Sequence, residues 1–136
     1  MHDMTGKTVL ITGASRGIGR DTALVFAAAG ANVALVARGT EKIDSLASEI
    51  GAKAVAIPCD VAKFQDVEAA VEQTLDSFGS LDVLIGNAGI IEPISHLATA
   101  DPEEWSFVVD VNLKGIFYGM RAVLPVMLKN GGGTIL

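Results

Sequence analysis

The feature that most limits the possible folds is a glycine-rich turn between an apolar run and a segment of helical period. The apolar run from Val9 to Ile11 is followed by glycines at positions 13, 17 and 19, and the helical pattern begins within this turn. Glycines in such a turn let the backbone approach a phosphate closely, and the free N–H groups of the following helix point at the negative charge. We therefore expect a strand-turn-helix unit that binds the phosphates of a nucleotide.

The alternation of strand and helix continues along the chain. Short β-branched runs predict strands at residues 8–12, 32–37, 54–58 and 83–86, and a last strand from about Thr134. Three helices are predicted between them, each with an apolar face and a glycine at its end: Ile18, Thr22, Val25, Phe26 and Ala29 before Gly30; Ile43, Leu46, Ala47 and Ile50 before Gly51; Phe64, Val67, Val71, Leu75 and Phe78 before Gly79. This order predicts an α/β fold with a doubly wound parallel sheet.

The last third of the chain predicts two more helices. Asp101 is placed to cap a helix whose first residue is Pro102. A longer helix is expected from about Lys114 to Lys129, with a bend at Pro125. No linker or change of composition divides the chain, so residues 1–136 are expected to form one domain.

Composition excludes several classes of protein. The net charge of −6 disfavours a nucleic-acid partner, which requires a basic surface. The single cysteine, Cys59, allows no intrachain disulfide, and no Cys/His cluster offers a metal site. The first residues lack the pattern of a signal peptide, and no apolar stretch is long enough to span a membrane. We expect a cytoplasmic protein in a reducing compartment, with no metal and no membrane contact.

The spacing of the glycines resembles that of the short-chain dehydrogenase/reductase family. Residues 12–19 match the family pattern T-G-x-x-x-G-x-G at every fixed position. The resemblance implies a Rossmann-type sheet with strand order 3-2-1-4-5 and an oxidoreductase that transfers a hydride between a nicotinamide cofactor and a carbonyl or alcohol substrate. It also implies cofactor-binding roles for Gly13, Ser15, Arg16, Gly17, Ile18 and Gly19.

Three further motifs extend the resemblance along the chain. Cys59-Asp60-Val61 follows the third predicted strand, where the family has an Asp that contacts adenine, so Asp60 and Val61 are expected to bind the cofactor. Asn87-Ala88-Gly89 follows the fourth strand and matches the family's N-A-G, which supports the sheet and lines the cofactor ribose; Gly86 stands where the family often has a second Asn. Asn112 lies where the family has its catalytic Asn, which supports a water chain to the catalytic Lys.

Each of these three residues also has a simpler interpretation. Asp60 is equally compatible with a turn or cap residue, and Asn87 with a plain turn. Asn112, taken by itself, is typical of a local hydrogen-bonding residue near a helix boundary.

The end of the second strand indicates which cofactor is preferred. The strand ends at Ala37, so no carboxylate is present to accept a hydrogen bond from the 2′-OH of the adenosine ribose. Arg38 follows directly. Arg38 and Arg16 can pair with a 2′-phosphate, which favours NADP over NAD. In the simpler alternative, both arginines are solvated surface residues.

The groups that the resembled family uses for proton transfer are not found. The family needs a Tyr, a Lys four residues later and a Ser, whereas the only tyrosine is Tyr118, with Ala122 four residues on. Tyr118 lies upstream of the expected position and is interpreted as a packing residue, and His2 and His96 offer no replacement.

The chain is expected to stop in or near the fifth strand, so the 136 residues alone are predicted to be inactive. We interpret them as the cofactor-binding, N-terminal part of an NADP-dependent oxidoreductase acting on a small carbonyl or alcohol. The alternative is a truncated, non-catalytic nucleotide-binding or interaction module. Because the resembled family commonly uses the helices that match residues 101–111 and 114–129 for subunit contacts, a homo-oligomer is expected in both cases.

Overall fold

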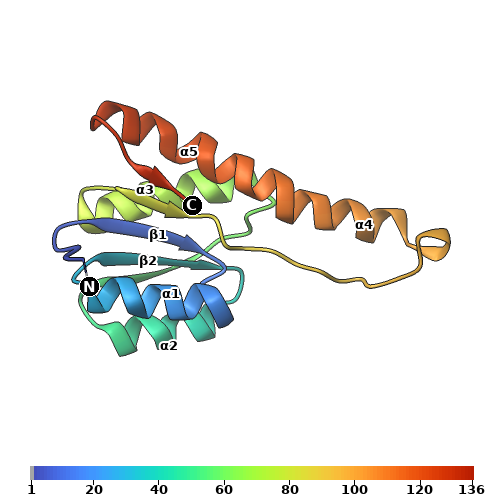
Figure 1. Cartoon of the computed structure of the whole chain (residues 1–136), viewed down its shortest axis with the longest axis horizontal. Helices are drawn as coiled ribbons and strands as arrows, with labels where there is room; N and C mark the ends of the chain where they lie inside the picture. The colour runs from blue at the N-terminus through green and yellow to red at the C-terminus, as the bar shows by residue number, and fades with distance from the viewer. Residues whose placement is uncertain (1) are drawn as a thin grey trace.

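The structure is a computed structural model that describes residues 2–136, and its centre is a five-stranded parallel sheet of order β3-β2-β1-β4-β5 (Figure 1). The strands are β1 (Thr8–Thr12), β2 (Asn32–Ala37), β3 (Ala54–Pro58), β4 (Val83–Ile85) and β5 (Thr134–Ile135). The predicted strand positions and strand order are confirmed, with β4 one residue shorter than expected.

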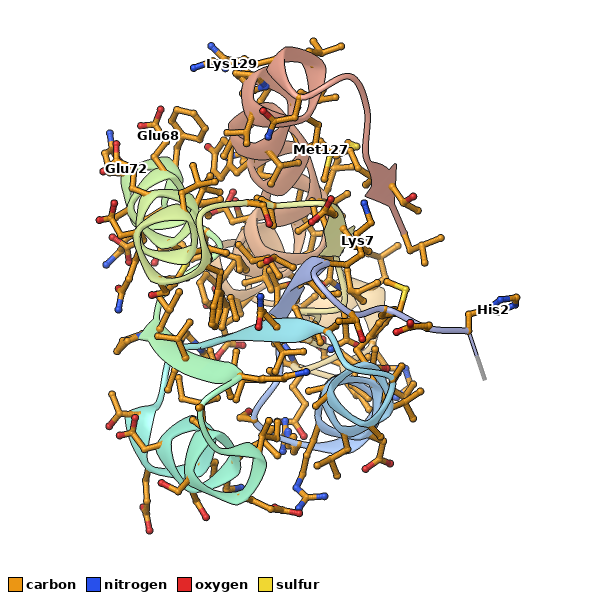
Figure 2. The ribbon with its side chains drawn as sticks, turned by 90° about the vertical axis from the view of Figure 1, so that its left-hand side faces the viewer. His2, Lys7, Glu68, Glu72, Met127 and Lys129 are labelled. Carbon is orange, nitrogen blue, oxygen red and sulfur yellow. The ribbon has the colours of Figure 1, made fainter. Side chains whose placement is uncertain are left out.

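Helices cover both faces of the sheet (Figure 1). The helices α1 (Gly17–Ala28) and α2 (Thr40–Ile50) pack on one face, and α3 (Phe64–Phe78) and α5 (Gly115–Lys129) pack on the other. Figure 2 shows Glu68 and Glu72 on the outer side of α3, pointing away from the sheet. The doubly wound architecture is therefore confirmed.

Alternate residues of the central strands supply two separate hydrophobic cores. In β1, Val9 and Ile11 pack toward α1 and α2, whereas Leu10 packs toward α3 and α5. Buried parallel strands are apolar on both faces for this reason. The predicted inner faces of α2 and α3 are confirmed, since Ile43, Leu46, Val67 and Val71 are all buried.

The inner face predicted for α1 is right in part: Phe26 packs against the core and Thr22 and Ala29 are partly buried, but Ile18 and Val25 are misplaced. Ile18 and Val25 are 77% and 58% exposed, and the residues that face the sheet are Gly19 and Ala23. A Cβ atom on Gly19 would collide with the carbonyl oxygen of Gly13, so the helix lies too close to the turn for a larger residue. The hydrophobic pattern did not reveal Gly19 at the centre of this face because glycine has no apolar side chain.

The last two predicted helices form one continuous helical segment. The helix α4 (Pro102–Val109) begins as expected, with Asp101 Oδ1 accepting hydrogen bonds from the backbone N–H groups of Glu103 (2.8 Å) and Glu104 (3.1 Å). A π-helical turn (Asp110–Lys114) then leads directly into α5, with no loop between them. The prediction of two separate helices is therefore wrong at this junction.

The segment between β4 and α4 extends beyond the edge of the sheet (Figure 1). It is irregular except for a short 3₁₀ turn (Leu97–Thr99), and none of the α4 residues, all of which the structure describes, is buried. Within residues 2–136, no helix combines the length and apolar character needed to cross a membrane.

Candidate functional site

A cavity of about 370 Å³ lies at the carboxyl ends of the strands. Its walls come from the segments that follow β1, β2, β3 and β4, the place where open α/β sheets bind ligands. The lining residues are Gly13, Ser15, Arg16, Gly17, Ile18, Ala37, Arg38, Cys59, Asp60, Val61, Asn87, Ala88, Gly89, Ile90 and Val111. The structure thus brings together every residue predicted to bind the cofactor except Gly19, which lies behind the turn.

The glycine turn is shaped by close contacts on its rear side. Gly13 and Gly17 have φ angles of +69° and +54°, a region that favours glycine. A Cβ atom on Gly13 would lie 2.9 Å from both the Cα atom of Ala88 and the side-chain nitrogen of Asn87. The backbone therefore lines the cavity floor, and α1 begins there without a side-chain cap on its first N–H groups.

Asn87 joins this turn to the segment after β4. Its Nδ2 donates to the carbonyl oxygens of Thr12 (2.9 Å) and Gly13 (3.2 Å), and the N–H of Ala88 donates to Thr12 Oγ1 (3.0 Å). These bonds connect residues 74 to 76 positions apart, so Asn87 does more than form a local turn. They fix Ala88 and Gly89 at the cavity wall.

Asp60 has the local hydrogen bonds of a turn residue and also lines the cavity. Its Oδ1 accepts from the N–H of Ala62 (3.1 Å), and its own N–H donates to Asp66 Oδ2 (3.1 Å). The Asp60 side chain remains 23% exposed, and Oδ2 lies 4.0 Å from Lys63 Nζ. The two interpretations of Asp60 are therefore compatible with one another.

Cys59 contributes a neutral wall to the cavity. It is 4% exposed, and burial together with the nearby Asp66 and Asp60 carboxylates raises the pKa of the thiol to about 12. Such a thiol is a poor nucleophile, because the thiolate is the reactive form. Cys59 was not predicted to line the cavity, although its position directly after a strand was a usable signal.

Asn112 lies in the π-helical turn and does not line the cavity. Its Oδ1 accepts from the N–H of Ile90 (2.8 Å), and its Nδ2 donates to the Ile90 carbonyl (2.7 Å). Both ends of the amide are thereby used to hold the segment that carries Ala88, Gly89 and Ile90. The bonded residues are 22 positions apart, so Asn112 joins the helical segment to the segment after β4 and does more than the local role would require. A part in a catalytic water chain stays a prediction.

A second hollow opens beside the cavity at the end of β2. Its volume is about 530 Å³, and it is lined by Ser15, Arg16, Arg38, Gly39 and Lys42. Three cations and no carboxylate line it, which makes it suited to an anion. Lys42 was not predicted, although its place four residues after Arg38, in the first turn of the helix that follows, was a usable signal.

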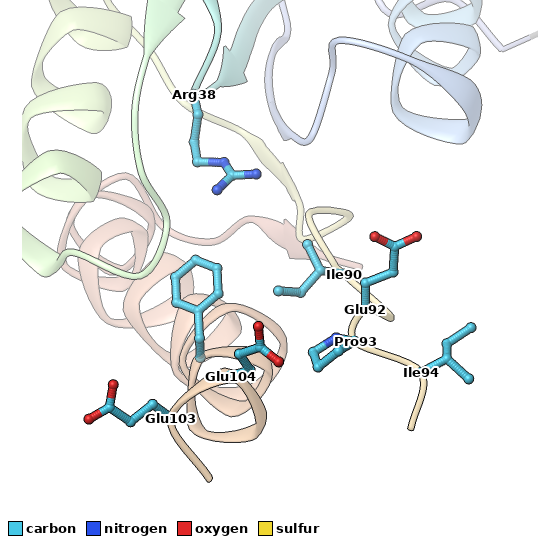
Figure 3. A pocket seen from close by; sticks show the side chains of 8 residues that line it. Arg38, Ile90, Glu92, Pro93, Ile94, Glu103 and Glu104 are labelled. Atoms are coloured by element: carbon cyan, nitrogen blue, oxygen red, sulfur yellow. The ribbon is translucent and has the colours of Figure 1, made fainter. Parts of the chain in front are cut away.

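Arg38 also borders a wide groove of about 810 Å³ between the segment after β4 and α4 (Figure 3). Figure 3 shows the Arg38 side chain projecting toward Ile90, with Glu92, Glu103 and Glu104 on the far walls. Phe107 of α4 also lines the groove. Arg38 therefore stands between an acidic groove and the basic hollow.

Tyr118 lies outside the residues that line these hollows. Its ring centroid is 5.4 Å from that of Phe64 and 5.8 Å from that of Phe117, so the ring packs between α3 and α5. His2 and His96 are exposed. None of these three residues shares the cavity with the predicted cofactor residues.

Comparison with known proteins places this geometry among oxidoreductases. The family model described as short chain dehydrogenase matches residues 7–136. The 3-oxoacyl-[acyl-carrier-protein] reductase FabG of Staphylococcus aureus is 43% identical over 134 residues, which cover 96% of this chain and 54% of the relative. The oxidoreductase UcpA of Salmonella typhimurium is 40% identical over 139 residues, covering 100% of this chain and 52% of the relative.

The fold also matches a solved structure closely. The crystal structure of 3-ketoacyl-(acyl-carrier-protein) reductase from Brucella melitensis, complexed with NADH, superposes with a TM-score of 0.92 at 40% identity. The match covers 95% of this chain and 53% of that one. The chain thus spans about half the length of the curated relatives and of the solved structure that it matches.

Proposed function

We propose, from the premise that this chain belongs to the short-chain dehydrogenase family, that residues 1–136 form the NADP(H)-binding Rossmann domain of an oxidoreductase. The reaction class is hydride transfer between the cofactor and a carbonyl or alcohol. Among the relatives, the reductases named for 3-oxoacyl-[acyl-carrier-protein] make a 3-oxoacyl group the first substrate to test in a longer parent protein.

The observation that carries the choice of NADP(H) is the basic hollow at the end of β2. Arg16, Arg38 and Lys42 line it without a carboxylate, beside the place where the adenosine ribose is expected. A 2′-phosphate there can pair with the planar guanidinium groups and with the point charge of the lysine. An acidic residue at position 37 or 38 would instead have favoured NAD(H), because its carboxylate would accept a hydrogen bond from the free 2′-OH.

The residues of the cavity fit the remaining parts of the same cofactor. The glycine turn and the start of α1 are suited to the pyrophosphate. Asp60 and Val61, which line the cavity, would contact the adenine, and Asn87, Ala88 and Gly89 would contact a ribose. NADP(H), when bound, supplies or accepts the hydride, while the chain's own residues bind and orient it. In this proposal Asn112 supports the cavity by holding Ile90.

A titration tests the proposed cofactor directly. We expect NADPH to bind at least about tenfold more tightly than NADH, because charge-assisted hydrogen bonds to the 2′-phosphate contribute on the order of 1.5–3 kcal/mol. Cofactor fluorescence on addition of the protein measures both affinities. Equal or reversed affinities would refute the NADP(H) assignment.

The second candidate is a non-catalytic nucleotide-binding or interaction module. It is favoured by one observation, the lack of a Tyr-x-x-x-Lys pair within the 136 residues, since Ala122 follows Tyr118 at the fourth position. We expect no oxidation of NADPH by this chain with any of a panel of carbonyls. Activity that persists through repurification would contradict this expectation, and the coding sequence beyond residue 136 distinguishes a longer enzyme from a short module.

We further propose that the chain associates with a second copy of itself. The outer side of α5 exposes Phe117 (55%), Leu124 (42%) and Leu128 (74%), and Leu113 (67%) continues the row into the π-helical turn. Successive residues of this row are separated by four, seven and four positions, which are whole helical turns. They therefore lie along one side of the helix. A row of exposed large apolar side chains indicates a contact surface.

A further inference from the structure

The first residue of α5, Gly115, packs directly against the turn that follows β3. A Cβ atom on Gly115 would lie 3.0 Å from Val61 Cγ2, 3.3 Å from Val61 Cβ and 3.4 Å from the Val61 carbonyl oxygen. Gly115 is buried, and Val61 is only 8% exposed and lines the cavity. A side chain at position 115 would therefore make an unusually tight contact with this cavity wall, and α5 or Val61 would have to shift by a few tenths of an ångström to accommodate it.

The turn that carries Val61 is held in place on both sides of it. The Asp60 N–H donates to Asp66 Oδ2 (3.1 Å), the Ala62 N–H donates to Asp60 Oδ1 (3.1 Å), and the Lys63 N–H donates to the Asp60 carbonyl (2.9 Å). Val61 is β-branched, so its side chain has few alternative rotamers. A methyl group at position 115 would therefore displace Val61 as a unit, and the open space available to it is the cavity.

The helix on the other side of the Gly115–Val61 contact is also held in place by hydrogen bonds. Asn112 is joined to Ile90 by two hydrogen bonds of 2.8 and 2.7 Å, three residues before Gly115. Val111, one turn before Gly115 on the same side of the helix, also lines the cavity. Moving α5 away from Val61 would strain the Asn112–Ile90 pair and shift Val111, so the cavity changes shape in this case too.

We infer that Gly115 is a positioning residue for the cofactor. It sets the distance between α5 and Val61, and thereby the space available to the adenosine end of NADP(H). Gly115 does not itself line the cavity, and its effect passes through Val61. The inference rests on the proposed function, because it assigns the Val61 end of the cavity to adenosine.

The test compares Gly115→Ala with Gly119→Ala. Gly119 is one turn further along the same buried side of α5, but a Cβ there would lie 3.3 Å from the terminal Cδ2 of Leu84, a flexible side chain that does not line the cavity. Both substitutions replace a helical glycine by alanine, so the gain in helix propensity is matched. The probe is 2′,5′-ADP, which carries the adenosine and both of its phosphates, titrated by calorimetry into the purified protein.

We expect Gly115→Ala to weaken 2′,5′-ADP binding about tenfold and Gly119→Ala to leave it nearly unchanged. Adding Val61→Ala to Gly115→Ala is expected to recover most of the loss, because it removes the side chain that the new methyl group displaces. Equal binding by wild type and Gly115→Ala overturns the inference. So does an equal loss in Gly119→Ala, or a loss that Val61→Ala does not relieve.

A second variant covers the case in which Gly115→Ala does not fold. Val61→Ile enlarges the same contact from the other side and is expected to weaken 2′,5′-ADP binding in the same way; unchanged binding by a folded Val61→Ile protein overturns the inference. The two hypotheses fail separately. Wild-type protein that binds neither NADPH nor 2′,5′-ADP contradicts the proposed function, whereas wild-type binding with no effect at position 115 contradicts only the role of Gly115.

Discussion

At the scale of single residues, charge placement carries most of the functional argument. The chain has a net charge of −6, yet Arg16, Arg38 and Lys42 meet in one hollow without a carboxylate among its lining residues. Other cations are committed elsewhere: Arg20 pairs with Glu49 at 2.8 Å and Lys7 with Asp82 at 3.1 Å. A local cluster of positive charge in an acidic protein attracts an anionic ligand to that place and to few others.

Removing either Arg38 or Lys42 therefore tests what the hollow binds. We expect Arg38→Ala to weaken NADPH about tenfold, and Lys42→Ala somewhat less, because an exposed ammonium group makes a weaker contact than a two-pronged guanidinium. NADH binding is expected to change by less than about twofold. Fluorescence titration with both cofactors measures the ratio, and Lys129→Ala, at the far end of α5, is the matched control (Figure 2). An equal loss for the two cofactors would show that these side chains do not contact the 2′-phosphate.

Cys59 gives a prediction about pH. Because burial and two carboxylates raise the pKa of the thiol to about 12, the folded protein keeps the proton that the unfolded chain loses near the ordinary thiol pKa. The folded-state pKa is above the unfolded one, so this contribution to stability is complete at neutral pH and is lost as the pH rises toward 12. At pH 8 we expect alkylation of Cys59 to be roughly a hundredfold slower in native protein than in protein unfolded by urea. Similar rates in the two states would contradict the buried, neutral thiol.

At the scale of elements, the sequence predicts what depends on local chemistry and misses what depends on packing distance. The strands could be located because β-branched runs stand between glycine and polar turns. The inner side of α1 could be located only in part, because Gly19 and Ala23 face the sheet for reasons of space. The π-helical turn that carries Asn112, which bonds to Ile90, was not predicted either, because no residue type specifies that geometry.

The same distinction applies to the candidate site. The cofactor residues could be predicted from the glycine turn, from Arg38 and from the resemblance to the family. They meet in the structure because they follow β1 to β4, and the carboxyl ends of parallel strands lie at one edge of the sheet. Val111 and Ile90 could not be predicted, since their place in the cavity depends on how α5 lies against the turn after β3. Gly115 stands between the two cases, because a helical glycine is visible in the sequence but the residue that it accommodates is not.

The start of α4 allows a test of a purely local interaction. Asp101→Ala removes the acceptor of two backbone N–H groups and is expected to cost about 1 kcal/mol at the helix start. Because no residue of α4 is buried, the loss should remain local and leave the melting temperature nearly unchanged. Hydrogen exchange of the Glu103 and Glu104 amides is expected to accelerate severalfold, and Asp101→Ser, which keeps a capping oxygen, should restore most of the protection. Unchanged exchange in the alanine variant would show that the cap does not hold the helix.

At the scale of the whole molecule, the two faces of the sheet are covered differently. The face of α1 and α2 carries the Arg20–Glu49 pair, which joins the two helices across their exposed surface. On the opposite face, α5 presents the row of Leu113, Phe117, Leu124 and Leu128. The face of α1 and α2 also exposes Ile18 and Val25, but the row on α5 is longer and continues toward α4, where Trp105 is 60% exposed. An asymmetry of this kind favours association through one face.

Charged substitutions on α5 test whether that face joins two copies. We expect the unaltered chain to sediment as a species heavier than 14.1 kDa, and the double variant Leu124→Glu with Leu128→Glu to sediment as a monomer. Both side chains are exposed, so the change should leave the melting temperature of the monomer within a few degrees of its original value. Val25→Glu places a charge on a residue of α1 that is 58% exposed, on the opposite face, and is the matched control. Only a carboxylate within the α5 row is expected to disrupt an apolar contact between two copies. Association that survives the α5 variant, or that Val25→Glu abolishes equally, would therefore show that the contact lies elsewhere.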